Sequence, residues 1–200
     1  MHVRPLALLS NALSYKFNPL SRRRYVKSVI KSSFSNPVIA EVGVFEGDLS
    51  FSTLLRCNPS ELLLIDPYAI YEGNKNDETQ KSQDRRYENL LLKAKNHSNI
   101  TVLRSSLSSL HHENYFSTRN LLVDVFYIDG DHSFEGALSD LEVSAKYLSP
   151  KGLIVIDDYF IGNPHYGIIK AVNLFLSSHP TFYIHGLNYN QLVLSRDPQG

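Results

Sequence analysis

Cysteine and long apolar runs are almost absent from this sequence. Its 200 residues include one cysteine, Cys57. A single thiol cannot close an intrachain disulfide or build a cysteine-rich zinc site, so we expect a protein of a reducing compartment, in the cytoplasm. The longest apolar runs, such as Gly152 to Ile156, fall far short of the roughly 20 residues that a membrane-spanning helix needs. The sequence therefore predicts a soluble protein with no membrane span.

An excess of charge of either sign is also missing. Twenty Lys and Arg residues balance twenty Asp and Glu residues, so the chain lacks the surplus of positive charge with which non-specific nucleic-acid binders neutralise phosphates. We expect no nucleic-acid partner. The balance hides an uneven distribution, because residues 1–36 contain seven Lys and Arg residues and no acid. All twenty acidic side chains fall in residues 37–200.

Length and charge together suggest how the chain is organised. Two hundred residues suffice for one core and leave little room for a second, so we expect a basic N-terminal cover segment, residues 1–36, and one folded domain, residues 37–200. Apolar side chains between Tyr25 and Phe34 recur at helical spacing, which predicts an amphipathic helix from about Ser21 that packs on the domain. The arginines at positions 22–24 are expected off its apolar side. A targeting peptide and a surface for a membrane or an anionic partner are the alternatives.

From Pro37 onward, apolar runs of strand length alternate with segments of helical periodicity, as in parallel β-α-β units. The expected strands are Val38–Val42, Leu62–Ile65, Ile100–Leu103, Val123–Ile128 and Leu153–Ile156. The expected helices are Ser50–Arg56, Arg85–Asn96, Phe134–Leu148 and Ile168–Ser177. The later runs Thr181–His185 and Gln191–Ser195 leave no room for a crossover helix and should pair as an antiparallel hairpin. The predicted fold class is α/β, a doubly wound, Rossmann-like sheet that is mostly parallel and ends in this hairpin.

Two glycines follow the first expected strand, at the edge where open α/β sheets bind ligands. Gly43 would let a ligand approach the backbone, Gly47 permits a tight turn, and the helix that follows offers free N–H groups to an anion. The segment is not the G-x-G-x-x-G fingerprint of nicotinamide cofactors, because Phe45 stands at its middle position and the third glycine is absent.

Polar side chains also follow the second and third strands. Asp66 lies 23 residues after Gly43, where a carboxylate can accept hydrogen bonds from both hydroxyls of a ribose. The alternative is a carboxylate that caps the turn at Pro67. After the third strand, Ser105 and Ser106 could hold the edge of an adenine.

Acidic residues follow the fourth and fifth strands. Asp129 and Asp131 come after the fourth, and Asp157 and Asp158 after the fifth, so that one crossover separates the two pairs. Neighbouring strands lie about 4.8 Å apart, so Asp129, Asp157 and Asp158 should project into one crevice. Crowded carboxylates need protons or a cation, and an all-oxygen set suits Mg²⁺, Ca²⁺ or Mn²⁺. The alternative is helix capping by Asp131 or Ser133.

Several segments together resemble a known family. They are EVGVFEG (41–47), LIDPY (64–68), YIDGDHSFE (127–135), Asp140-Leu141 and LSPKGLIVIDDY (148–159). From about Pro37 to Ser195 the chain resembles class I S-adenosylmethionine-dependent methyltransferases, and among them the small-molecule O-methyltransferases that include sugar O-methyltransferases of antibiotic pathways. The resemblance implies a seven-stranded sheet of the class I methyltransferase type.

The resemblance also implies roles for the candidate residues. Those that would contact S-adenosyl-L-methionine are Glu41, Gly43, Gly47, Asp66, Ser105, Ser106 and Asp129. Asp129, Asp157 and Asp158 would bind a divalent cation, Mg²⁺ for example, that lowers the pKa of the substrate hydroxyl and orients it for in-line methyl transfer. Asp131 or His132 would take the proton.

We therefore expect an O-methyltransferase that acts on a hydroxyl of a small molecule with the help of a divalent metal. A metal-independent methyltransferase with His132 as its base, and an inactive relative that binds the cofactor or a partner, are the alternatives. The polar loop Tyr71–Asp84 is expected to serve as a lid over the acceptor. His165 is a candidate for the crevice rim, His111 and His112 are expected at the surface, and a homodimer is one expectation for the oligomeric state.

Overall fold

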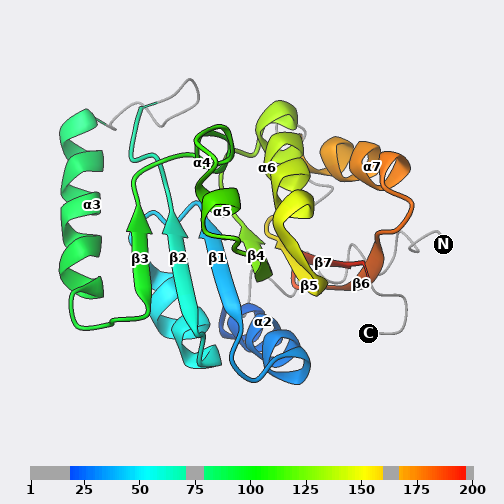
Figure 1. Ribbon diagram of the computed structural model, residues 1–200, viewed down its shortest axis with the longest axis horizontal. Coiled ribbons are helices and arrows are strands. Elements are labelled where there is room, and N and C mark those ends of the chain that lie inside the picture. Colours follow the sequence, from blue (N-terminus) through cyan, green and yellow to red (C-terminus); the bar gives the residue numbers. More distant parts are fainter. Residues whose placement is uncertain (1–18, 71–78, 160–166, 197–200) are drawn as a thin grey trace.

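A seven-stranded sheet forms the centre of the computed structural model (Figure 1), which describes residues 19–70, 79–159 and 167–196. The strand order is β3-β2-β1-β4-β5-β7-β6. Strands β1 to β5 pair in parallel, whereas β7 is antiparallel to both β5 and β6. The strands are β1 (Val38–Val42), β2 (Glu61–Ile65), β3 (Ile100–Leu103), β4 (Val123–Ile128), β5 (Leu148–Ile156), β6 (Tyr183–Asn188) and β7 (Gln191–Ser195). The predicted mixed sheet with a terminal hairpin is confirmed.

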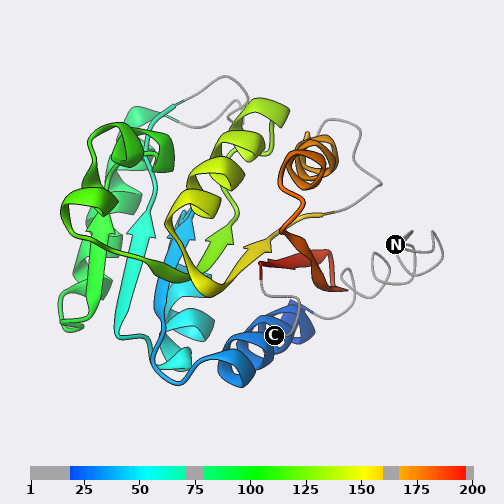
Figure 2. The ribbon, with the colours of Figure 1, turned by 45° about the vertical axis from the view of Figure 1, so that its right-hand side comes forward.

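Helices cover both faces of this sheet. Figure 2 shows α6 and α7 on one side and α2 on the other. The helices are α2 (Pro19–Ser33), α3 (Gln80–Ala94), α4 (Leu107–His112), α5 (Tyr115–Thr118), α6 (Phe134–Tyr147) and α7 (Ile168–Ser178), with a π-helical turn η1 (Ser50–Leu54) and a 3₁₀ turn η2 (Leu55–Cys57). Within the described parts of the chain, none of them combines the length and the apolar character that crossing a membrane requires.

The two faces bury separate hydrophobic clusters. One contains Phe126 of β4 and Phe175 of α7, and the other contains Val125 of β4 with Val26 and Ile30 of α2. Because side chains alternate along a strand, neighbouring residues of β4 serve opposite clusters. Val26 and Ile30 are both 0% exposed, so the predicted amphipathic helix exists and packs on the sheet.

The structure corrects several predicted boundaries. Strand β5 begins at Leu148 rather than Leu153, because Leu148 pairs with Val123 before a register shift. The Ser149 hydroxyl also donates to Asp124 (2.8 Å) and fixes this extension. Strand β6 continues to Asn188, and the hairpin closes through a two-residue turn at 189–190 in which both residues have positive φ, as hairpins with tight turns require.

Helical segments differ from prediction for local reasons. Helix α3 begins at Gln80 rather than Arg85, because Thr79 and Ser82 form a reciprocal capping box. Residues 80–84 are therefore helical and not part of a loop, while residues 71–78 of that predicted lid lie outside the described residues, as does His165. Helices α4 and α5 were not predicted, since six and four residues are too few to show helical periodicity. The helix expected at Ser50–Arg56 consists of the turns η1 and η2.

Candidate active site

A cavity of about 860 Å³ opens at the carboxyl ends of β1, β2 and β4. This is the edge at which open α/β sheets bind ligands. The predicted cofactor residues that line it are Glu41, Gly43, Asp66, Ser105, Ser106 and Asp129. Asp131 of the predicted acid cluster lines it too, as does Arg22 from α2.

Backbone hydrogen bonds between neighbouring strands place these residues. The N–H of Gly43 donates to Ile65 (2.9 Å), and that of Asp129 donates to the carbonyl of Val42 (2.8 Å). The N–H of Asp157 donates in the same way to Ile128 (2.9 Å). The parallel ladder thus continues one residue beyond the strands and brings the first residue after each of them, Gly43, Asp129 and Asp157, to the same edge.

Gly43 stands where the chain crosses closest to the loop after β4. A methyl group on its Cα would lie 2.1 Å from the carbonyl oxygen of Asp129, and its φ is +85°. A side chain is therefore excluded both by contact and by backbone conformation. Gly47 does not line the cavity: its φ is +78°, and the space beside its Cα holds side-chain atoms of Leu90 and Phe51.

The carboxylate of Asp66 organises the loop after β1. It accepts the backbone N–H groups of Val44 (2.9 Å) and Phe45 (3.0 Å), and also that of Tyr68 (2.8 Å). The bond from Tyr68 is the turn cap that was the alternative interpretation. Because a carboxylate has about four lone-pair positions, three N–H groups leave capacity for a ligand hydroxyl at the cavity wall.

Glu41 lines the cavity, although only 2% of its surface is exposed. The Ser50 hydroxyl of η1 donates to its carboxylate. Burial, with smaller effects from Asp129 and Asp66, raises the pKa of Glu41 from 4.5 to about 8, although the Ser50 hydrogen bond opposes the shift. Burial therefore favours the protonated form of Glu41.

Ser105 and Ser106 line the same cavity but differ in their contacts. The side chain of Ser106 accepts the N–H of Ser109 (3.1 Å) and caps the N-terminus of α4. The Ser105 hydroxyl donates to the carbonyl of Ser106 at 3.3 Å. Because Ser106 is held by its capping hydrogen bond, Ser105 is the better candidate for a ligand contact.

Beside the cavity, Asp129, His132 and Asp158 form a polar centre. One potential ligand atom from each lies within 4.8 Å of the other two, so the group could hold a metal ion. His132 Nε2 is 3.3 Å from Asp129 Oδ1. Burial alone would lower the pKa of His132, but the hydrogen bond to Asp129 and the surrounding carboxylates outweigh it and raise the pKa above 6.5. Burial and Asp129 likewise raise the pKa of Asp158.

Asp131, the other predicted proton acceptor, is engaged at the start of α6. Its two carboxylate oxygens accept the backbone N–H and the hydroxyl of Ser133, each at 2.9 Å. Ser133 in turn caps α6 by accepting the N–H of Gly136 (3.0 Å). The capping role that was the alternative interpretation is present here.

Asp157 differs from the other acids because it is buried, with 1% of its surface exposed. Its carboxylate accepts the hydroxyl of Tyr127 (2.7 Å) and the backbone N–H of Asp158 (2.8 Å). It also forms an ion pair with the guanidinium of Arg22. The predicted metal set was Asp129, Asp157 and Asp158, whereas the geometric grouping has His132 in place of Asp157.

Arg22 is the site residue that sequence reasoning missed. Its guanidinium lies 3.9 Å from Asp129 Oδ2 and 4.0 Å from Asp158 Oδ1, in addition to the pair with Asp157. The expectation that the arginines lie off the apolar side of the helix is wrong for Arg22. A signal was available, because Arg22 stands four residues before Val26 and eight before Ile30, which puts all three on one helix face.

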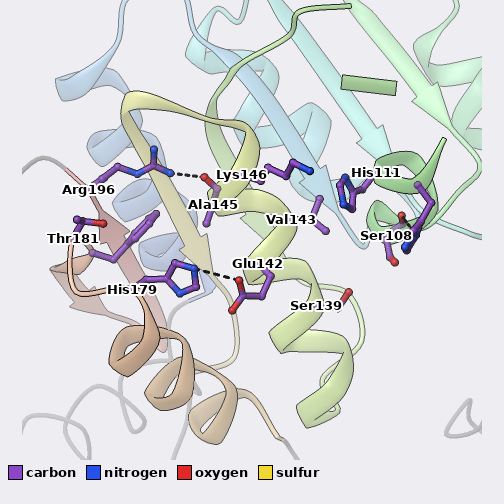
Figure 3. Close-up of a pocket in the computed structure, with 12 residues that line it drawn as sticks. Ser108, His111, Ser139, Glu142, Val143, Ala145, Lys146, His179, Thr181 and Arg196 are labelled. Carbon is purple, nitrogen blue, oxygen red and sulfur yellow. Dashed lines mark hydrogen bonds and ion pairs between the residues drawn. The ribbon is translucent and has the colours of Figure 1, made fainter. Parts of the chain in front are cut away.

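A second cavity, of about 590 Å³, lies over α4, α6 and the start of β6 (Figure 3). Three of its polar groups have local partners: His179 pairs with Glu142 (3.3 Å), and Arg196 donates to the carbonyl of Ala145. His112 is exposed as expected, but His111 is half-buried and its Nδ1 lies 2.8 Å from the hydroxyl of Tyr147. We assign the chemistry to the first cavity.

Comparison with protein families gives one match that covers most of the sheet. Residues 40–159 match a family described as "Methyltransferase domain". Among curated proteins, uncharacterized protein R132 of Acanthamoeba polyphaga mimivirus is 40% identical over 37 residues. That stretch is 18% of this chain and spans 17% of the length of the relative.

Solved structures share the fold at low sequence identity. The O-methyltransferase NovP superposes with a TM-score of 0.62 at 14% identity, over 88% of this chain and 80% of NovP. An O-methyltransferase from Bacillus cereus, solved in complex with SAH, has a TM-score of 0.59 at 12% identity, over 98% of this chain and 92% of that chain. A putative rRNA-methylase from Clostridium thermocellum has a TM-score of 0.58 at 14% identity, over 98% of both chains.

Proposed function

The chain belongs to the methyltransferase-domain family that it matches over residues 40–159, and from this premise we propose that it is an S-adenosyl-L-methionine-dependent O-methyltransferase acting on a hydroxyl of a small molecule. The observation that carries the proposal is the position of Asp129. This residue borders the large cavity and also belongs to the polar centre with His132 and Asp158. A methyl donor in the cavity and a proton acceptor in the centre would therefore be adjacent.

The large cavity fits the proposed cofactor. Its volume of about 860 Å³ lies in the range of small-molecule sites. Asp66 offers oxygen atoms to ribose hydroxyls and Ser105 a hydroxyl to the adenine. Gly43, which has no side chain, lets the cavity wall pack against the backbone of Asp129. S-adenosyl-L-methionine, when bound, supplies a methyl group on a positively charged sulfur, so the protein contributes positioning and proton transfer.

We propose that His132 takes the proton from the substrate hydroxyl that receives the methyl group. Asp129 hydrogen bonds to its ring (3.3 Å) and would stabilise the imidazolium that forms when the proton arrives. Both carboxylate oxygens of Asp131, the competing candidate, accept hydrogen bonds from Ser133 at the start of α6. The geometry thus favours His132 as the base.

A divalent cation fits beside this base. Asp129 and Asp158 both face the polar centre, and Mg²⁺ is commonly held by one or two carboxylates, with substrate oxygens and water completing its shell. We propose that these two carboxylates hold Mg²⁺ or a similar ion. Such an ion, when bound, supplies charge that lowers the pKa of an acceptor hydroxyl.

The charge of the site favours a small acceptor over a nucleic acid. The polar centre contains Asp129 and Asp158, and Asp131 and Asp157 lie close to these residues in the chain. The negative charges of these carboxylates would repel the phosphates of an RNA backbone. One structural neighbour is described as a putative rRNA-methylase, but two others are O-methyltransferases. We propose a cytoplasmic enzyme with a small-molecule acceptor, in keeping with the acidic centre.

Calorimetry with S-adenosylhomocysteine and with Mn²⁺ tests the two halves of the proposal separately. The wild-type protein should bind S-adenosylhomocysteine. Asp158→Asn should weaken Mn²⁺ binding by about 30-fold, because one of two charged ligands is lost, and leave S-adenosylhomocysteine binding within about threefold.

The matched control is Asp131→Asn, which removes the same charge from the same cluster. It should weaken Mn²⁺ binding by no more than about threefold, since both carboxylate oxygens of Asp131 accept hydrogen bonds from Ser133, the N-cap of α6. Absence of S-adenosylhomocysteine binding would refute the methyltransferase proposal, and equal Mn²⁺ affinities of the two variants would refute the cation site at Asp158.

A further inference from the structure

The side chain of Arg22 occupies the middle of the acidic cluster. Its guanidinium pairs with Asp157 and lies about 4 Å from carboxylate oxygens of Asp129 and Asp158. We propose that Arg22 is the resident counter-ion of Asp157, that it withholds this carboxylate from a divalent cation, and that it thereby sets a weak affinity for that cation. This inference rests on the proposed function, since it concerns the cation site of the same centre.

Strand alternation explains why Asp157 faces Arg22. Tyr127 on β4 pairs with Val155 on β5, and Val155 pairs with Val193 on β7. All three belong to the hydrophobic cluster on the α2 side of the sheet. Side chains two residues away point to the same face, so Asp157 and Gln191 also face α2. Three neighbouring strands thus present Tyr127, Asp157 and Gln191 toward the start of this helix.

Arg22 is fixed in this polar pocket by its backbone as well as its side chain. In the amide orientation that satisfies both of its polar atoms, Gln191 accepts from Arg22 Nε (2.9 Å) and donates to the carbonyl of Arg22 (3.3 Å). The guanidinium also donates to the hydroxyl of Tyr127 (3.3 Å). One and two turns later, Val26 and Ile30 are fully buried. The guanidinium is therefore built into the fold, and only 17% of the side chain is exposed.

Asp157 itself supports the backbone at the cation site. Asp157 Oδ1 accepts the N–H of Asp158 (2.8 Å), and Asp158 adopts a left-handed backbone with φ +49°. A residue other than glycine needs support from its surroundings to keep this conformation. Asp157 thus holds the backbone that directs Asp158 toward Asp129 and His132, and this hydrogen bond does not require Arg22.

Two effects of Arg22 weaken cation binding. The guanidinium removes Asp157 from the ligands that a divalent ion could recruit, and its positive charge lies about 4 Å from the two remaining carboxylates. A like charge at such a distance disfavours an incoming cation. In its absence, Asp157 would be a buried carboxylate without a counter-charge, which is strongly unfavourable. A cation that takes the place of Arg22 would relieve this cost.

The test uses the full chain and Mn²⁺ as the probe, with free Mn²⁺ measured by electron paramagnetic resonance. Arg22→Gln should bind Mn²⁺ at least about tenfold more tightly than the wild type, through both effects. Its melting temperature should fall in EDTA and recover with Mn²⁺, because a ligand of the native state stabilises it. Arg24→Gln removes the same charge from an exposed position of the same helix and should stay within about threefold of the wild type.

The double variant Arg22→Gln with Asp157→Asn separates ligand recruitment from simple charge removal. It should lose most of the gain in Mn²⁺ affinity and should melt at a similar temperature with EDTA and with Mn²⁺. The inference is overturned if Arg22→Gln binds Mn²⁺ no better than Arg24→Gln, if the double variant keeps the gain, or if Arg22→Gln fails to fold even with Mn²⁺. Binding of S-adenosylhomocysteine to the wild-type protein is measured in the same series. It tests the methyltransferase proposal independently of the three Mn²⁺ and folding outcomes that would overturn the inference about Arg22.

Discussion

The site has two sides. The cofactor side is the cavity wall with Glu41, Gly43, Asp66, Ser105 and Ser106, and the acceptor side is the polar centre with Asp157 and Arg22. The interactions that stabilise the two sides span different distances along the chain. On the cofactor side, Asp66 receives its hydrogen bonds from residues 2, 21 and 22 positions away. On the acceptor side, Asp157 depends on Arg22 from the N-terminal helix and on Tyr127, 30 positions away. The hydrogen-bond partners on the cofactor side come from adjacent β-α units. Those on the acceptor side come from α2, β4 and β7, which are far apart in the sequence. Changes on the cofactor side should therefore act locally, and changes on the acceptor side through long-range partners.

The largest effect should come from breaking the cofactor side at its closest approach. Gly43→Ala should weaken S-adenosylhomocysteine binding by at least about 100-fold in calorimetry, because its Cβ would overlap the carbonyl of Asp129 and its φ of +85° disfavours a side chain. Gly130→Ala is the control in the same wall. There the nearest atom to the new methyl is Asp140 Oδ2 at 3.3 Å, and the loss should stay below about fivefold. Equal losses would show that contact at Gly43 is not what shapes the cavity.

The next effect concerns Glu41, where burial on the cofactor side makes stability depend on pH. The unfolded chain loses this proton near pH 4.5, and the folded protein keeps it to about pH 8. The stabilising contribution of the protonated form is thus complete below pH 4.5 and is lost as the pH rises through 8. Glu41→Gln should remove this loss. Its unfolding free energy relative to the wild type should therefore rise by on the order of 4 kcal/mol between pH 4 and pH 8.

Urea denaturation at a series of pH values measures the difference. Glu88→Gln, at an exposed position of α3, is the control and should follow the wild-type profile. A Glu41→Gln profile parallel to that of the wild type would mean that Glu41 is ionised in the folded state. The cofactor side would then carry a buried negative charge, as the acceptor side does.

The sheet was largely predictable, because buried strands of a parallel sheet are continuous apolar runs. The bounds of β1, β3, β4 and β7 agree with the prediction. The extension of β5 to Leu148 could not be predicted, since Pro150 and Gly152 indicate a turn. The pairing of Leu148 with Val123, before the register shift, overrides this signal. The short helices α4 and α5 carry too little periodicity to be recognised.

For the candidate site, the sequence predicted which residues lie together at the sheet edge, but not which ion pairs and hydrogen bonds they form there. Asp129, Asp157 and Asp158 were expected to project into one crevice, and in the structure their carboxylates lie around one guanidinium. The partner came from Arg22, 135 residues before Asp157, and local pattern contains no information about such a pairing. The arginines were expected off the apolar side of the helix. The helical phase that Arg22 shares with Val26 and Ile30 could have indicated that this arginine faces inward, but not which residue it contacts.

The smallest expected effects distinguish two neighbouring serines of the cofactor side, both predicted to lie by the adenine. Ser106→Ala removes the N-cap of α4 and should lower the unfolding free energy by about 1 kcal/mol, while S-adenosylhomocysteine affinity changes by less than about threefold. Ser105→Ala should do the reverse, with stability nearly unchanged and affinity reduced by about three- to tenfold, the value of one hydrogen bond to a ligand.

Denaturation and calorimetry on both variants decide between these outcomes, and each serine is the matched control for the other. If Ser106→Ala loses affinity with no cost in stability, the hydroxyl of Ser106 leaves its capping bond to contact the ligand. The cofactor side would then rearrange on ligand binding. On the acceptor side, long-range partners fix each group, so the two sides would differ in flexibility as well as in the sequence separation of their contacts.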